Sequence, residues 1–232
     1  MAAQFTGFTP ETTEILMGIR MNNTKEWYQA HKEDYAAHVR NPMVLLADEC
    51  CAFMQQMDNA FTPRPKVSRP YRDTRFAANK DPIKECIWFF LRNDASPGIQ
   101  HSEPTYFFEV SPDWWRMGLG YWPMKAAQMG AFRTKVAAAS DLAARLFAEA
   151  QKESGFTLEG DMYKKTPKTD GISETAAALF AYKNLTLIKY GQHDTTMCNR
   201  KLLDEVCEGF RALHPLYQYI LETSQLCTDT KK

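Results

Sequence analysis

The basic residues between Arg64 and Lys84 are the strongest candidates for chemistry in this sequence. The segment has seven Lys or Arg residues and two acids, in a chain whose formal net charge is zero. Guanidinium groups match phosphate and carboxylate groups with paired hydrogen bonds, so an arginine-rich segment is suited to bind an anion. We predict that its ligand-binding residues are Arg69, Tyr71, Arg72, Asp73, Arg75, Lys80 and Lys84.

Two residues elsewhere in the chain are further candidates for the same site. Trp122 stands between Tyr121 and Pro123, close to Gly120, and its indole could stack on the organic part of a ligand. Lys165, within the basic turn at 164–168, could supply a second cationic wall. We include both in the predicted ligand-binding set.

Two alternative interpretations of the same residues stay open. In one, Arg72, Asp73 and Arg75 form an internal ion-pair network that pins a loop, and the protein has a structural or interaction role. In the other, the protein is an enzyme without a recognisable motif, and a carboxylate such as Asp73 or Glu109 is its acid or base. The enzyme hypothesis requires a carboxylate with a displaced pKa inside a pocket.

Composition and charge limit the class of protein. Hydrophobic residues make up 44% of the chain and aromatic residues 12%, enough for a substantial buried core rather than disorder. A neutral chain has no global field to attract long duplex nucleic acid or an anionic membrane. No apolar run reaches the roughly 20 residues of a membrane helix, and no targeting signal is recognisable. We expect a cytoplasmic protein with buried free thiols.

The sequence lacks the motifs of common cofactor and metal sites. Neither a phosphate-binding loop of the G-x-x-x-x-G-K-[ST] type nor a dinucleotide G-x-G-x-x-G motif occurs. His31 and His38 share a helix face, but no third ligand stands at a recognisable metal spacing. We therefore expect no metal and no cofactor, and an anionic small molecule or nucleotide as the partner. The sequence does not indicate the oligomeric state.

Hydrophobic periodicity and capping signals predict helices at both ends of the chain and strands in the middle. Thr9-Pro10 starts a helix that ends near Arg20, Thr24 caps a second, and Asn41-Pro42 caps a third that ends near residue 57. Apolar or alternating runs predict strands, the first of them fully buried, and alanine-rich or amphipathic runs predict helices. The strands are expected at 86–92, 105–110, 115–121, 156–163 and 185–190, and the later helices at 124–136, 141–152, from 173, at 199–213 and at 215–223.

These elements predict an α+β fold with a central, mostly antiparallel sheet surrounded by helices. No repeat, low-complexity segment or long linker divides the chain. We expect a single domain at 1–226, followed by a polar tail at 227–232.

The sequence resembles the bacterial family known as domain of unknown function 2461. Four stretches carry the resemblance: N-N-T-K-E-W-Y at 22–28, R-P-Y-R-D-T-R-F with K-D-P-I-K at 69–84, G-Y-W-P at 120–123, and Y-K-K-T-P-K at 163–168. Ile83 stands where this family usually has an aromatic residue, and Thr169 replaces the glycine of its turn. The resemblance implies a single-domain α+β fold in a cytoplasmic bacterial protein and implies no activity.

The residues favour a binding function over the two alternatives. We hypothesise a pocket for a phosphate-bearing or carboxylate-bearing small molecule, with the anion held by Arg69, Arg72, Arg75, Lys80 and Lys84. Trp122 or Tyr71 would pack on the organic part of that ligand.

Overall fold

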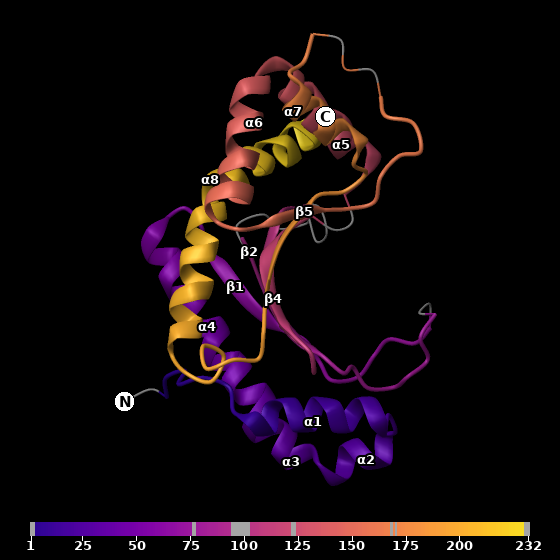
Figure 1. The fold of residues 1–232 in the computed structure, drawn as a ribbon, viewed down its shortest axis with the longest axis vertical. Helices are drawn as coiled ribbons and strands as arrows, with labels where there is room; N and C mark the ends of the chain where they lie inside the picture. The colour runs from indigo at the N-terminus through magenta and orange to yellow at the C-terminus, as the bar shows by residue number, and fades with distance from the viewer. Residues whose placement is uncertain are drawn as a thin grey trace. The chain divides into compact units, whose positions relative to one another are not determined.

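Six strands form one antiparallel sheet, and helices lie around it (Figure 1). The structure is a computed structural model that describes residues 3–75, 78–93, 103–121, 124–167, 169 and 171–229, without the side chains of 153 and 224–229. The predicted α+β class with a central antiparallel sheet is confirmed.

The described elements follow the expected sequence of helices, strands and helices. The strands, in the order β1-β2-β3-β4-β6-β5 across the sheet, are β1 (Pro63–Val67), β2 (Ile87–Asn93), β3 (Thr105–Val110), β4 (Trp115–Gly120), β5 (Thr157–Glu159) and β6 (Thr186–Gly191). The α-helices are α1 (Pro10–Met21), α2 (Lys25–Ala30), α3 (Lys32–Asp34), α4 (Asn41–Met57), α5 (Ala126–Ala138), α6 (Ser140–Ala148), α7 (Glu174–Ala178) and α8 (Lys201–Asp229). Tyr35–Arg40 and Glu149–Glu153 are π-helical, and Leu179–Ala181 is a 3-10 helix.

The start of α4 corrects one prediction from sequence. Asn41 is not a helix cap, because the π-helical turn before it runs directly into α4. Pro42 has no N–H to offer the carbonyl of His38, four residues earlier. The hydroxyl of Thr12 in α1 donates a hydrogen bond of 2.6 Å to that carbonyl instead. The proline is therefore tolerated inside a continuous helical run.

The last helix corrects a second prediction. A break was expected before Pro215, but α8 runs through it without interruption. Leu213, Leu216 and Tyr217 around the proline are all buried. Their packing outweighs the single helical hydrogen bond that a proline removes.

Prolines also explain the position of β1. Pro63 and Pro65 pair with Asn93 and Leu91 of β2 in antiparallel register, and β1 is at one end of the strand order. An edge strand accommodates proline because one side of its backbone has no ladder to complete. The sequence predicted only extended backbone here, so the pairing is new information. At the other end of the order, β5 is much shorter than the predicted strand at 156–163.

The chain divides into two compact units. The first contains Met1–Asn93, Phe107–Met117 and Tyr190–Glu208, and the second Asp94–Tyr106, Gly118–Lys189 and Gly209–Lys232. Strands β3, β4 and β6 each belong in part to both units. The expected domain boundary at residue 226 stays a prediction.

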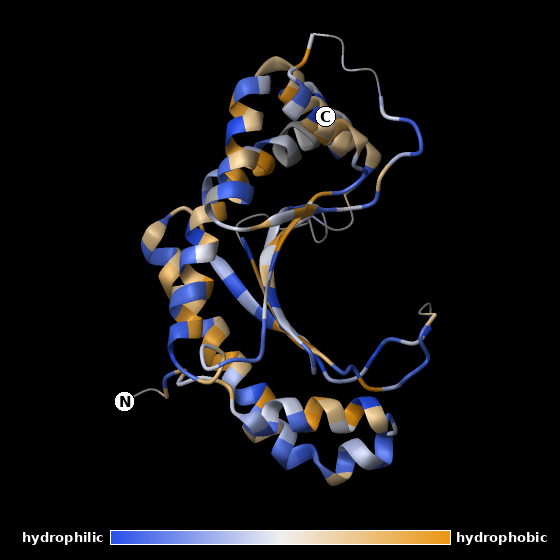
Figure 2. Ribbon diagram, in the orientation of Figure 1, coloured by the Kyte–Doolittle hydropathy of each residue, from blue (hydrophilic) through white to orange (hydrophobic). Residues whose placement is uncertain are grey.

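In the first unit, α4 packs against β1 and β2 (Figure 1). Helices α1 to α4 mix blue and orange residues in Figure 2, as amphipathic helices do. The buried aromatic core includes Phe89 of β2, whose ring lies 5.8 Å from that of Phe108 in β3. Phe108 in turn stacks on Phe8 at 6.3 Å.

In the second unit, α5, α6 and α7 pack on one another. Phe132 of α5 meets Phe147 of α6 edge to face, and both rings are buried. The Arg133 guanidinium donates hydrogen bonds to the carbonyls of Phe180 at 3.1 Å and Tyr182 at 2.8 Å. These contacts tie the 3-10 turn before β6 to α5.

Among the helices of the described residues, none combines the length and the apolarity needed to cross a membrane.

Candidate functional site

The basic segment folds back on itself as two antiparallel arms in the first unit. The Arg72 N–H donates to the Pro82 carbonyl, and the Lys84 N–H donates to the Pro70 carbonyl, both at 2.8 Å. Tyr71 and Ile83 form an isolated antiparallel bridge between these two pairs. The prolines thus leave the segment extended, and main-chain hydrogen bonds fix the register of its arms.

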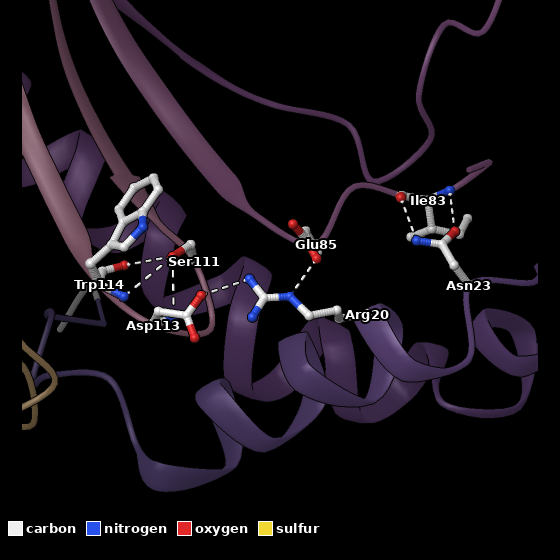
Figure 3. Close-up of polar contacts among 7 residues, drawn as sticks. All are labelled: Arg20, Asn23, Ile83, Glu85, Ser111, Asp113 and Trp114. Atoms are coloured by element: carbon white, nitrogen blue, oxygen red, sulfur yellow. Dashed lines mark hydrogen bonds and ion pairs between the residues drawn. The ribbon is translucent and has the colours of Figure 1, made fainter. Parts of the chain in front are cut away.

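An asparagine clamps the second arm to the helices (Figure 3). The Asn23 side chain donates to the Ile83 carbonyl and accepts from the Ile83 N–H, both at 2.9 Å. The Ile83 side chain is fully buried. One amide side chain therefore completes the backbone hydrogen bonds of Ile83 much as a neighbouring strand would.

An arginine holds the start of β2 and the β3–β4 turn to α1 (Figure 3). The Arg20 guanidinium donates to Glu85 at 2.6 Å and to Asp113 at 2.8 Å. The Ser111 hydroxyl closes the turn by accepting from the N–H groups of Asp113 and Trp114, each at 3.2 Å. The turn predicted at 111–113 is therefore present and anchored.

Residues 83–92 present two faces, which their contacts distinguish. The Glu85 side chain pairs with Arg20 and so points toward α1, and the Ile83 side chain is fully buried. The alternation continues in β2, where every second residue is buried and the residues between are half-buried. We call Ile83, Glu85, Ile87, Phe89 and Leu91 the helix-packed face, and Lys84, Cys86, Trp88, Phe90 and Arg92 the open face. The strand was expected to be buried on both sides, and that expectation was wrong for the open face.

The open face continues onto the neighbouring strands. Phe108 of β3 packs on Phe89, so Glu109 next to it points to the other side of the sheet. Arg116 of β4 pairs with Glu109 through hydrogen bonds of 2.6 Å. Its guanidinium also lies 4.8 Å from the Trp114 ring centroid and 3.5 Å from the Tyr190 hydroxyl.

Two of the predicted anion-binding residues are engaged within the loop itself. Arg75 makes a bidentate pair with Asp73, with nitrogen–oxygen distances of 2.9 and 2.7 Å. Lys80 donates to the Thr74 carbonyl at 2.9 Å. Both side chains thus stabilise the tip of the loop.

Asp73 is exposed and strongly acidic. Hydrogen bonds from the Arg75 side chain and backbone hold the pKa of its carboxyl at about 2. A carboxylate with such a low pKa is a poor proton acceptor near neutral pH. This geometry argues against Asp73 as a general base.

Arg69, Arg72 and Lys84 form what we call the cation cluster. Lys84 donates to the carbonyls of Arg69 at 2.5 Å and Tyr71 at 3.0 Å, and Arg72 donates through Nε to the Asp81 carbonyl at 3.2 Å. Burial lowers the pKa of Lys84 below its usual value, and the charges of Arg69 and Arg72 lower it further. Within the part of the chain that the structure describes, no carboxylate pairs with any of these three cations at ion-pair distance.

Cys86 lies between the cation cluster and Glu109. Burial raises the pKa of its thiol to about 12, and the charge of Glu109, which is also its hydrogen-bond partner, adds to the shift. Arg72 and Lys84 oppose the shift by attracting the thiolate. The thiol is thus a protonated donor at neutral pH rather than a nucleophile. Glu109 itself is only 9% exposed, and the ion pair with Arg116 occupies it.

The remaining predicted site residues are Tyr71, Lys165 and Trp122. Tyr71 is 41% exposed, its ring meets Tyr28 edge to face, and its hydroxyl accepts from Gln29 at 2.7 Å. Lys165 belongs to the second unit, so its part in a common site stays a prediction. Trp122 lies outside the described residues.

Sequence reasoning missed Cys86 and Trp88 as site residues. The apolar run at 86–92 hid them, because its composition does not show which alternate positions are covered. The charged residues that bracket the run, Lys84 and Arg92, were the one available signal of an uncovered face.

A family model covers most of the chain. A family model described as "Conserved hypothetical protein (DUF2461)" matches residues 11–219. The chain belongs to this family. No curated protein matches the chain.

Residues 22–28, one of the stretches that carry the resemblance, make specific contacts in this chain. Within N-N-T-K-E-W-Y, Asn23 clamps Ile83, and the Thr24 side chain caps α2 by accepting from the Trp27 N–H at 3.1 Å. The Trp27 ring lies against Gly18 of α1, where an added Cβ would come within 2.6 Å of it. The motif therefore positions the R-P-Y-R-D-T-R-F segment.

Proposed function

We propose that the protein binds a small molecule that carries a phosphate or carboxylate group, with the cation cluster as the anion site. This proposal rests on the charges of Arg69, Arg72 and Lys84, none of which forms an ion pair with a carboxylate within the described residues. Cations are normally paired when they gather in a partly buried place, because their repulsion and desolvation are costly. A bound anion would supply the missing charge.

The hydrogen-bonding capacity of the cluster supports the same conclusion. Arg72 uses one of its guanidinium donors on a backbone carbonyl, and the exposed Arg69 side chain has no hydrogen bond within the described residues. Two guanidinium groups next to an ammonium group offer the forked donors that phosphate and carboxylate oxygens accept. Arg75 and Lys80, which the loop itself engages, would be supporting residues.

Isothermal titration calorimetry with inorganic pyrophosphate tests the proposal. The wild type should bind, and Arg69→Gln/Arg72→Gln should weaken binding by about tenfold or more through the lost charge-assisted hydrogen bonds. The matched control is Arg145→Gln/Lys152→Gln, which removes the same charge from an exposed helical surface of the second unit. It should bind as the wild type does.

Three results would overturn the proposal: no binding by the wild type, equal binding by the cluster variant, or equal weakening in the control. Far-UV circular dichroism and a melting curve establish that each variant is folded. The single variant Arg69→Gln protects the test against misfolding, because that side chain is exposed.

A further inference from the structure

Trp88 and Phe90 form an aromatic stack on the open face, and no predicted function used it. Their ring centroids are 5.3 Å apart, and the ring planes differ by only 16°. Both side chains are half-buried although each is large and apolar. Aromatic rings on an uncovered sheet face are a common means of binding planar heterocycles.

The two rings differ in how much of their surface is occupied. Phe90 lies 5.6 Å from the Lys66 ammonium and 5.6 Å from the Arg92 guanidinium, in addition to stacking on Trp88. Phe90 stacks on the face of the Trp88 indole that lies toward residues 89–92. Within the described residues, no second ring stacks on Trp88. Its remaining indole face is therefore directed along the chain toward Cys86 and Lys84.

Backbone contacts fix Trp88 close to the cation cluster. The Ser68 N–H donates to the Trp88 carbonyl at 2.8 Å, and the Trp88 N–H donates to the Ser68 hydroxyl at 3.2 Å. Arg69 directly follows Ser68. Lys84 lies four residues before Trp88, and the charges of Lys84 and Arg72 act on the Cys86 thiol between them. Long cationic side chains shorten the distance between the cluster and the indole to one that a phosphate, a sugar and a base can span.

We propose that the ligand is a nucleotide, with its base stacked on the indole of Trp88 and its phosphate on the cation cluster. This inference rests on the proposed function and names its ligand class. The site offers one ring face and one cation cluster. These correspond to one base and one phosphate. Cys86 and the Glu109–Arg116 pair lie on the same face, beside the interval that the sugar would occupy.

The test compares three probes by isothermal titration calorimetry: adenosine 5′-monophosphate, ribose 5-phosphate and inorganic phosphate. The wild type should bind adenosine 5′-monophosphate about tenfold more tightly than ribose 5-phosphate, because a stacked base adds affinity that is independent of the phosphate. Trp88→Leu should abolish this preference and leave the affinity for ribose 5-phosphate unchanged. Trp88→Phe, which keeps a ring, should retain most of the preference.

The matched control is Trp114→Leu, which removes another half-buried indole of this unit. The Trp114 ring already has Arg116 over it and Tyr190 at its edge, so its removal should leave the preference as it is in the wild type. A short single-stranded oligonucleotide with a 5′-phosphate is a further probe, and binding no tighter than that of the mononucleotide is expected. Much tighter binding would replace the mononucleotide with single-stranded nucleic acid as the ligand.

The outcomes separate this inference from the proposed function. If the wild type binds none of the probes and no pyrophosphate, both fail. If it binds ribose 5-phosphate and adenosine 5′-monophosphate equally, or if Trp88→Leu keeps the preference, the anion site stands and the nucleotide inference falls. If Trp88→Leu does not fold, the inference is still tested by comparing adenosine 5′-monophosphate with ribose 5-phosphate on the wild type and on Trp88→Phe.

Discussion

The two faces of residues 83–92 both carry apolar side chains, but the side chains of one face are more deeply buried than those of the other. On the helix-packed face, Phe89 and its neighbours are buried, and the backbone and charged groups find partners in α1 and in the α1–α2 connection. On the open face, Trp88 and Phe90 stay half-buried, and the three residues of the cation cluster form no ion pair with a carboxylate within the described chain. The two faces therefore differ both in burial and in the partners of their charged groups.

The largest expected contrast is between two adjacent phenylalanines. Phe89→Ala should lower the free energy of unfolding by about 3–5 kcal/mol, because it leaves a cavity against Phe108. Phe90→Ala should cost only about 1 kcal/mol, because that ring is half-exposed and its partners are a stacked ring and two cations. Urea unfolding curves measure both values. Equal losses would show that the open face is part of the core, and the comparison of the faces would be wrong.

The next contrast concerns the polar contacts that hold the helix-packed face. Asn23→Ala should lower the free energy of unfolding by about 2 kcal/mol, because it leaves the buried N–H and carbonyl of Ile83 without partners. Asn22→Ala is the matched control, since the Asn22 side chain makes one exposed hydrogen bond of 3.2 Å to the Gly18 carbonyl. Its cost should fall within about 0.5 kcal/mol of zero. Similar losses in the two variants would remove the clamp as an explanation of the family's opening motif.

The sequence predicted the elements of this molecule better than it predicted the contacts between them. Local signals located α1, β2, β3 and β4 closely, because capping residues and apolar runs act over a few positions. The continuity at Asn41 was missed because Pro42 depends on a hydroxyl from Thr12, thirty residues away. The same limit applies to Pro215, where burial of the flanking residues decides the outcome.

The same limit applies to the candidate site: the sequence identified its segment but not the contacts of its side chains. Arginine spacing identified the segment, but it did not distinguish Arg75, which pairs with Asp73, from Arg69 and Arg72. That distinction depends on where each side chain points after the two arms pair. The open-face position of Trp88 was equally hidden, because it follows from the helices that cover Phe89 and not from the run of apolar residues.

The smallest expected effect is a dependence of stability on pH that comes from the ion pair between Arg20 and Asp113. Hydrogen bonding to Arg20 holds the pKa of Asp113 below its usual value, so the folded state favours the ionised carboxylate. The contribution of this pair to stability is therefore present above the unfolded-state pKa of about 4 and is lost as the pH falls through the lower folded-state pKa. Asp113→Asn should lower the urea midpoint slightly at pH 7 and flatten its dependence on pH below about 4, where the difference from the wild type should disappear. The control Asp73→Asn removes another carboxylate of depressed pKa, from an exposed pair with Arg75, and should leave the affinity of the anion site for pyrophosphate within a few-fold. If Asp113→Asn keeps the full acid sensitivity of the wild type, the anchoring of the β3–β4 turn by Arg20 contributes nothing measurable.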